Sequence, residues 1–168
     1  MRAYDSMPSL LGSQMCIRVS LNTTGSYNTA PGRPALCTNT TGHSNPASGY
    51  TALHSNTTGA GNLALGTKAL FTNTTGFNNT ANGSDALYFN STGANNTALG
   101  NRALYSTTTG DKNAAFGVQA LYFNSTGAYN TAMGSDALYS IRTGQNNTAL
   151  GHSAFSSNTT GHINTAVG

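Results

Sequence analysis

The chain has 168 residues, of which only 7% are charged, whereas a soluble globular domain usually has about 25%. Its formal net charge of +3 comes from basic residues that are scattered along the chain and never cluster. The sequence therefore lacks the basic patch that a nucleic-acid interface needs, and we expect no nucleic-acid partner.

Residues 1–20 stand apart from the rest of the chain because they contain no repeat. Their apolar stretches are short and are broken by polar residues, which fits neither a signal peptide nor a membrane span. The run MPSLLGSQMCIRVS resembles the translated product of a sequencing or cloning linker. We interpret residues 1–20 as a non-repeat leader, either a linker artefact or disordered, and residues 21–168 as the repeat domain.

The repeat domain is a strict array with a period of 17 residues. Its unit reads N-T-T-G-x-x-N-T-A-x-G-x-x-A-L-x-x, and the places of this unit are counted below from its first asparagine. Eight full copies run from Asn22 to Ser157 and a partial ninth ends at Gly168, so we expect a truncated array. A period this regular predicts a solenoid in which each copy forms one turn.

Two glycines in each unit predict two corners in each turn. The fourth and eleventh places are glycine in every copy, as at Gly93 and Gly100, which favours positive φ or close backbone approach there. The intervening stretches, N-T-A-x-G and x-A-L-x-x, have the length of short strands rather than helices. We therefore predict an all-β parallel β-solenoid, or β-roll, with two short strands per turn. Turns stacked at ~4.8 Å would form a rod roughly 40 Å long.

When the turns stack, the residues at each place of the unit form a ladder along the rod. Alanine at the ninth and fourteenth places and leucine at the fifteenth predict a narrow core, and the invariant asparagine at the seventh place predicts an amide ladder. The thirteenth place alternates in sign on three consecutive turns, at Lys68, Asp85 and Arg102, which predicts a salt ladder on an exposed edge.

Two further ladders are candidate functional sites. One is aromatic and occupies the sixteenth place on five consecutive turns. Its members are Phe71, Tyr88, Tyr105, Tyr122 and Tyr139. We expect this stack to stiffen the rod or to pack against a partner chain, and the alternative is a platform for a receptor or a sugar.

The other candidate is an apolar stripe at the tenth place, whose residues alternate with alanine and should therefore point out of the coil. It includes Leu65, Leu99, Phe116, Met133 and Leu150. A stripe of this kind on most turns is more than a monomer usually exposes, so we predict that these side chains pack between chains.

No catalytic or metal-binding constellation recurs in the repeats. Outside the leader the acids are Asp85, Asp111 and Asp136, and the four histidines are scattered over the places of the unit. We therefore expect no enzyme activity, no cofactor and no metal. The repeats also contain eleven N-x-S/T sequons, which predict glycans only if the chain passes through a glycosylating secretory route. They begin at Asn22, Asn39, Asn56, Asn73, Asn78, Asn82, Asn90, Asn95, Asn124, Asn146 and Asn158.

The motif N-T-A-x-G followed by x-x-A, as in residues 96–103 and 130–137, resembles the head repeat of trimeric autotransporter adhesins, the YadA-like head. That resemblance implies parallel β-rolls of three chains side by side, displayed on a cell surface to bind host matrix or other cells. We expect a host surface glycan or matrix protein as the partner. The unit here is a few residues longer, and the extra length is the N-T-T-G side. Similar 17-residue arrays with A-L-Y-x-N-T-T-G occur in tail-fibre-like proteins, which implies a virion fibre as another setting.

We therefore expect a non-catalytic structural or binding module of an extracellular adhesin or fibre, assembled as a homotrimer. The alternative is an ice-binding solenoid, because threonine is abundant at the second, third and eighth places and such surfaces use flat ranks of threonine. The threonines at the second and third places are adjacent, so both hydroxyls cannot face outward from one flat strand. This adjacency weighs against ice binding.

Overall fold

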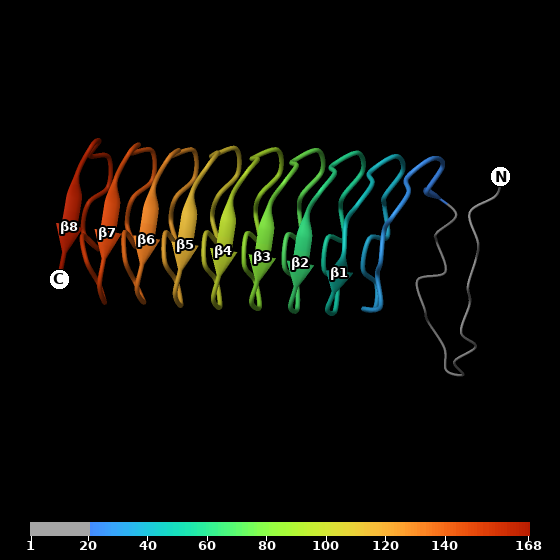
Figure 1. Cartoon of the computed structure of the whole chain (residues 1–168), viewed down its shortest axis with the longest axis horizontal. Coiled ribbons are helices and arrows are strands. Elements are labelled where there is room, and N and C mark those ends of the chain that lie inside the picture. The colour runs from blue at the N-terminus through green and yellow to red at the C-terminus, as the bar shows by residue number, and fades with distance from the viewer. Residues whose placement is uncertain (1–20) are drawn as a thin grey trace.

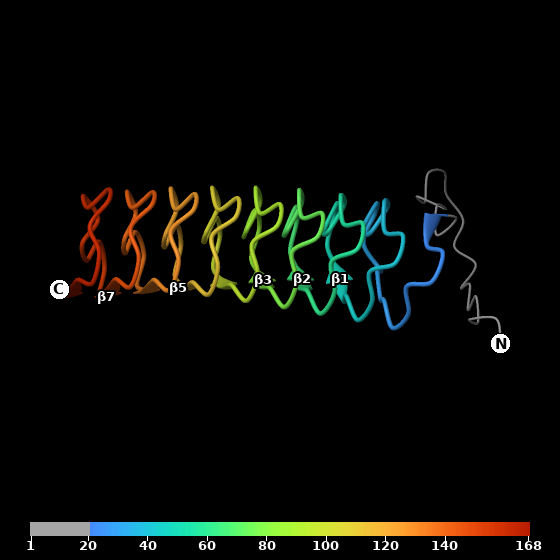
Figure 2. The same cartoon turned by 90° about the horizontal axis from the view of Figure 1, so that it is seen from above.

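A computed structural model describes residues 21–168, which coil into a rod of stacked turns (Figure 1). The predicted leader, residues 1–20, lies outside the described residues. One short strand from each of eight turns contributes to a single parallel sheet along one side of the rod (Figure 2). The strands are β1 (Ala47–Ser48), β2 (Leu63–Leu65), β3 (Thr80–Asn82), β4 (Thr97–Leu99), β5 (Ala114–Phe116), β6 (Thr131–Met133), β7 (Thr148–Leu150) and β8 (Thr165–Val167).

The strands follow one another in chain order, and each residue pairs with its counterpart in the next turn. Ala98 in β4, for example, pairs with Ala81 in β3 and Ala115 in β5. A parallel bridge between Thr29 and Pro46 continues the row before β1. This register confirms the predicted parallel β-solenoid of 17-residue turns.

Each strand covers the eighth to tenth places of the unit, where inward and outward side chains alternate. In β4, Ala98 is fully buried while Thr97 and Leu99 on either side are partly exposed. Successive residues of a strand point to opposite faces of the sheet. The tenth-place side chain therefore points out of the coil, as its alternation with alanine predicts.

The prediction of a second strand in each turn, on the x-A-L-x-x side, is wrong. Within residues 21–168 this side consists of hydrogen-bonded bends rather than extended chain. Both Ala103 and Leu104 are fully buried although they are neighbours in sequence. An extended strand would send one of the two side chains outward. The chain instead takes positive φ at Arg102 (55°) and Leu104 (53°), and these bends turn both apolar side chains inward.

Left-handed backbone at residues other than glycine recurs throughout the rod, at the sixth, thirteenth and fifteenth places of most turns. Such residues cost roughly 1–2 kcal/mol each relative to ordinary backbone. They persist here because the backbone N–H at nearly every bend donates a hydrogen bond to a carbonyl of a neighbouring turn. Leu104 N donates to Ala120 O at 3.0 Å, and the same bond joins Leu87 to Ala103. These inter-turn bonds and the burial of leucine offset the backbone strain.

The core is as narrow as the sequence predicts. It consists of the alanine ladders at the ninth and fourteenth places and the leucine ladder at the fifteenth, and in the central turns all three are fully buried. Two sides of the coil that face each other through methyl groups leave room for one large side chain per turn. Leucine fills that position in each turn from Leu53 to Leu138.

The two corners of each turn use glycine for different reasons. Gly100, at the eleventh place, has φ of 139°, and a Cβ there would meet the carbonyl of Gly117. Gly93, at the fourth place, has no positive φ, but a Cβ there would meet Gly110 O and the side chain of Asn90. The eleventh place therefore needs glycine for its backbone conformation as well as for space, and the fourth place needs it for space alone.

The predicted amide ladder at the seventh place is present and buried. Asn62 donates from both its backbone nitrogen (3.0 Å) and Nδ2 (3.2 Å) to Oδ1 of Asn45 in the preceding turn. Nδ2 of Asn62 also donates to Gly76 O at 2.8 Å. The ladder thus bonds each turn to the turns on either side and fixes the fourth-place corner.

A second buried asparagine ladder lies at the first place of the unit, where the sequence alone shows a sequon. Asn56 Nδ2 donates to Asn39 Oδ1 at 2.8 Å and to Gly59 O at 3.0 Å. Asn73 repeats both contacts one turn later. The two asparagine ladders share the corner carbonyls, because Gly59 O also accepts from Asn45.

Candidate functional site

The five predicted aromatic residues come together as one continuous stack on the turn side of the rod. Adjacent ring centroids lie 5.1–5.3 Å apart, with interplanar angles of 11–27°. Their positive-φ neighbours at the fifteenth place point inward, which leaves the sixteenth-place rings half-buried on the surface. His54 extends the stack by one ring, 5.2 Å from Phe71.

Ring faces inside this stack are already covered by neighbouring rings. A ligand that reaches the ladder therefore meets ring edges and tyrosine hydroxyls rather than open faces. Burial raises the pKa of Tyr105 above its ordinary value, and the nearby Tyr122 and the Asp85 carboxylate raise it further. Tyr105 is therefore held more firmly in its neutral form than an exposed tyrosine.

Two phenylalanines outside the predicted ladder belong to the same cluster. Phe89 lies edge-on to Tyr88 at 4.7 Å and to Tyr105 at 5.2 Å. Phe123 repeats this arrangement two turns later against Tyr122 and Tyr139. The available signal was their position next to a tyrosine at the seventeenth place, where other turns have serine or threonine.

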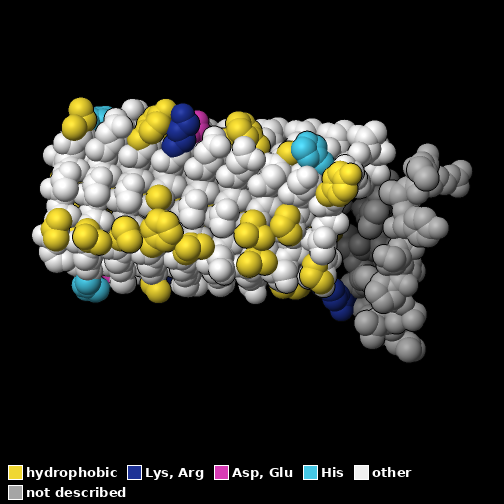
Figure 3. Space-filling model, viewed as in Figure 1, with side chains coloured by type: hydrophobic (Ala, Val, Ile, Leu, Met, Phe, Trp, Pro, Cys, Tyr) yellow, Lys and Arg dark blue, Asp and Glu magenta, His cyan; other side chains and the backbone are white. Residues whose placement is uncertain are grey.

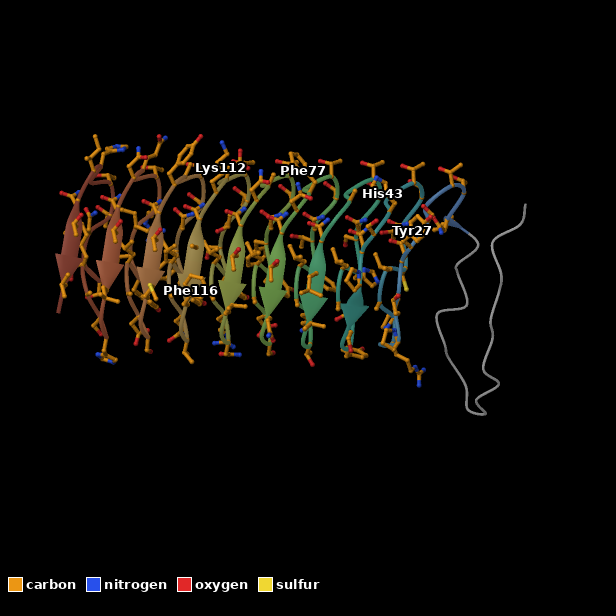
Figure 4. All side chains as sticks on the ribbon, in the orientation of Figure 1. Tyr27, His43, Phe77, Lys112 and Phe116 are labelled. Carbon is orange, nitrogen blue, oxygen red and sulfur yellow. The ribbon has the colours of Figure 1, made fainter. Side chains whose placement is uncertain are left out.

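The tenth-place stripe lies along the outer face of the sheet, where Figure 3 shows a row of apolar side chains. Leu65, Leu99 and Phe116 are partly exposed. Met133 and Leu150 are 45% and 47% exposed. Figure 4 shows Phe116 on this face, away from the corner that bears Lys112. The structure thus places the five predicted packing residues on one side, with Asn82 as a polar gap between Leu65 and Leu99.

No charged residue stands at the outward places of this sheet face among residues 21–168. Its other rank, at the eighth place, is mostly threonine, as at Thr97, Thr131 and Thr148. The face is therefore a flat, uncharged surface with one apolar rank and one rank of hydroxyl-bearing side chains.

The adjacent threonines at the second and third places have different environments. At the second place the hydroxyl bonds to the neighbouring turn: Thr40 Oγ1 donates to Thr57 O at 2.9 Å, and Thr57 Oγ1 to Thr74 O at 3.0 Å. At the third place the side chains are exposed, as at Thr58 and Thr75. One hydroxyl of each pair is therefore used within the rod, in line with the expectation that the two cannot both face outward.

The predicted salt ladder is only half formed. Arg102 Nε lies 3.6 Å from Asp85 Oδ2. No ion pair joins Lys68 to Asp85 in the part of the chain that the structure describes. Side chains on a surface edge pay entropy to hold such contacts, so one loose pair contributes little stability.

Residues 21–168 contain no group of three or more His, Cys, Asp or Glu side chains that could hold a metal ion. They also contain no helix long and apolar enough to cross a membrane. The chain matches none of the protein-family models, curated proteins or solved structures with which it was compared. The surfaces that bear on function are therefore the aromatic ladder and the outer face of the sheet.

Proposed function

We propose that this array is a non-catalytic structural module of an extracellular fibre or surface adhesin, displayed on a cell or a virion. The observation that supports this most is the unbroken register: every strand from β1 to β8 pairs with its counterpart one unit away. Such a rod is long and stiff and keeps the same surface along its length. These properties suit a shaft that holds a binding site away from a surface.

Association with further copies of the same chain through the sheet face is the second part of the proposal. The tenth-place stripe exposes apolar side chains on successive turns, and the face has no charges that would repel a second copy. A copy has the same 17-residue spacing, so its ranks would match those of the first chain at every turn. Three chains around a common axis, as the adhesin resemblance implies, would bury the stripe of each.

The aromatic ladder has a structural role in this proposal. Its rings stack on each other over five turns and are braced by Phe89 and Phe123, which opposes bending of the rod. A host glycan or matrix protein would contact the ring edges and hydroxyls of the ladder.

Sedimentation analysis of the chain made in a bacterial cytoplasm tests the association. The double variant Leu99→Asn and Phe116→Asn replaces two stripe residues by the residue that Asn82 already places on β3, so the fold should survive. The wild-type chain should sediment as a trimer and the double variant as a monomer, with unchanged circular dichroism.

A matched control places the same polar residue outside the sheet face. Val118 is 47% exposed at the twelfth place, where Asn101 stands one turn earlier. Val118→Asn should leave the trimer intact. A wild-type chain that is monomeric at high concentration, or a control that dissociates as readily as the double variant, would refute association through this face.

Ice binding stays the second candidate because Thr97, Thr131 and Thr148 point outward from an in-register sheet. The rank is interrupted, however, by Pro46, Leu63 and Ala114 at the same place. A regular lattice of hydroxyls is what an ice surface would need, so the interruptions favour the fibre.

A further inference from the structure

Ten of the eleven sequons of the chain fall into two structural groups, and Asn82 lies apart from both. In the first group, the asparagine is the first residue of the unit and belongs to the buried second ladder. These are Asn39, Asn56, Asn73, Asn90 and Asn124, all between 0% and 3% exposed. Asn22 and Asn158, in the terminal copies, are partly exposed.

A glycan on a buried sequon is incompatible with the rod. Asn56 Nδ2 donates to Asn39 Oδ1 and to Gly59 O, so both of its hydrogens are already used. Attachment of a sugar would replace one of them and would force a bulky polar group against the fourth-place corner. A chain modified there cannot stack its next turn.

The second group lies at the opposite extreme of exposure. Asn78, Asn95 and Asn146 occupy the sixth place, at the corner that leads into β3, β4 and β7. Their backbone φ of 54–58° lifts each side chain away from the coil. All three side chains are exposed, and none forms a hydrogen bond with any described residue. Figure 4 shows this edge, where Phe77 precedes Asn78 and Lys112 holds the same place on another turn.

The third residue of these sequons is also accessible. Asn78, Asn95 and Asn146 are each followed two residues later by an eighth-place threonine, whose side chain points outward from the strand. The intervening residue is the buried seventh-place asparagine. The asparagine and threonine side chains that define each of these sequons therefore face solvent, while the asparagine between them anchors the corner.

We infer that Asn78, Asn95 and Asn146 are the N-glycan acceptors of the folded array. The donor is an oligosaccharide linked to a lipid pyrophosphate. The asparagine Nδ2 forms a bond to the anomeric carbon of the first sugar, the bond from that carbon to the pyrophosphate oxygen breaks, and the amide proton passes to the released lipid pyrophosphate. This inference rests on the proposed extracellular role of the chain, with its export taken to pass through a glycosylating route.

Glycans at these positions would form a row along one edge of the rod, one or more turns apart. The sheet face beyond the edge stays free, so a glycosylated chain can still associate. Asn82, the remaining exposed sequon, is different because it lies in the tenth-place stripe itself. A glycan on Asn82 would separate two sheet faces, and its occupancy therefore reports on association.

Secretion of the full chain from a yeast host, behind a cleavable signal, tests the inference. Enzymatic removal of the glycans in isotope-labelled water marks each modified asparagine, and mass spectrometry of the peptides maps it. The folded, secreted protein should carry glycans at Asn78, Asn95 and Asn146 and none on the five buried sequons. Occupied buried sequons in protein that keeps the wild-type melting temperature, or empty corner sequons, would overturn the inference.

Two sets of variants keep the test decisive. Thr80→Ala, Thr97→Ala and Thr148→Ala together remove the corner sequons without changing the left-handed asparagines, and alanine already stands at this place as Ala114. All three glycans should be lost with no loss of secretion. If early modification of buried sequons blocks secretion of the wild-type chain, replacing their exposed third-place threonines by alanine should restore it. These are Thr41, Thr58, Thr75, Thr92 and Thr126. Empty corner sequons in that restored chain would equally refute the inference.

The same maps distinguish this inference from the association proposal. Trimer and monomer fractions are separated by size and mapped individually. Occupied corner sequons together with a glycan on Asn82 in the trimer would show that the sheet face is not the interface, while the acceptor assignment stands. Empty corner sequons in a trimer would refute the acceptor assignment and leave the association proposal standing.

Discussion

The buried side-chain oxygen of Asn90 has no hydrogen-bond partner, and Thr107 stands where the next asparagine of the ladder would donate to it. One turn earlier, Asn90 Nδ2 itself donates to Asn73 Oδ1 at 2.8 Å. Ile141 interrupts the ladder in the same way two turns after Thr107, and it leaves Asn124 Oδ1 and Asn158 Nδ2 without partners. The second asparagine ladder thus has two defects, each bordered by an unpaired amide.

Thr107→Asn should stabilise the rod, because the new amide would donate to Asn90 Oδ1 and accept from Asn124. A buried polar atom left unpaired costs roughly 1–3 kcal/mol, so a gain of about 1 kcal/mol is expected. Thermal unfolding of protein from a bacterial host should show a Tm higher by about 2–4 °C. Thr109→Asn, at an exposed place two residues later, is the control and should change nothing. A Tm that is unchanged or lower for Thr107→Asn contradicts the ladder account.

Gly100→Val should disrupt the array locally. The backbone φ of 139° is disfavoured for a β-branched residue, and the new Cβ would meet the carbonyl of Gly117. The conformational strain alone costs about 1–3 kcal/mol. Asn101→Ser is the matched control, since the neighbouring residue is exposed and Ser84 holds the same place. Equal melting temperatures for the two variants would show that the corner does not depend on glycine.

Alkaline pH should destabilise the rod through the aromatic ladder. The pKa of Tyr105 is raised in the folded state, so the stability that this residue contributes is fully present below the ordinary tyrosine value of about 10 and is lost as pH rises through the raised pKa. Urea unfolding measured between neutral pH and strongly alkaline pH should show this loss. Tyr105→Phe should lose less stability over the same interval, and an identical loss would exclude Tyr105 as its source.

Substitutions in the aromatic ladder and in the eighth-place threonines distinguish the fibre function from ice binding. Replacing Tyr88, Tyr105, Tyr122 and Tyr139 by serine should weaken binding to a glycan or matrix array, or lower the melting temperature through the lost stack. Ice growth should be unaffected because the fibre proposal predicts no effect on ice. Thermal hysteresis in the unmodified protein, abolished by bulky residues on the eighth-place threonines but not by the tyrosine replacements, would favour the ice-binding alternative. Those threonines are Thr97, Thr131 and Thr148.

The sequence predicts the solenoid, its 17-residue turn, its narrow alanine and leucine core and its seventh-place amide ladder, because periodicity and side-chain size determine these features directly. It does not reveal how Ala103 and Leu104, neighbours in sequence, both reach that core, since this depends on left-handed backbone that leucine rarely adopts. The x-A-L-x-x stretch is short enough to form either a strand or a run of turns.

The role of the first-place asparagines was also hidden. A sequon such as Asn56-Thr57-Thr58 has the same letters whether its amide faces solvent or a neighbouring amide. The aromatic stack was predicted from spacing alone, whereas the bracing by Phe89 depends on ring orientation that one sequence does not encode. Contacts between neighbouring turns, rather than patterns within one turn, decide these details.

The strict pairing of each residue with its counterpart one unit away has a consequence for length. Because Ala98 pairs across the sheet with the equivalent alanines of the two neighbouring turns, a whole unit added to or removed from the array creates no new kind of pairing. Each such change would move everything beyond it by one turn, about 4.8 Å. An addition of a single residue would instead misalign every ladder at once. The number of repeat copies in the gene therefore sets the length of the rod. That length can change in steps of one turn while the surface stays the same.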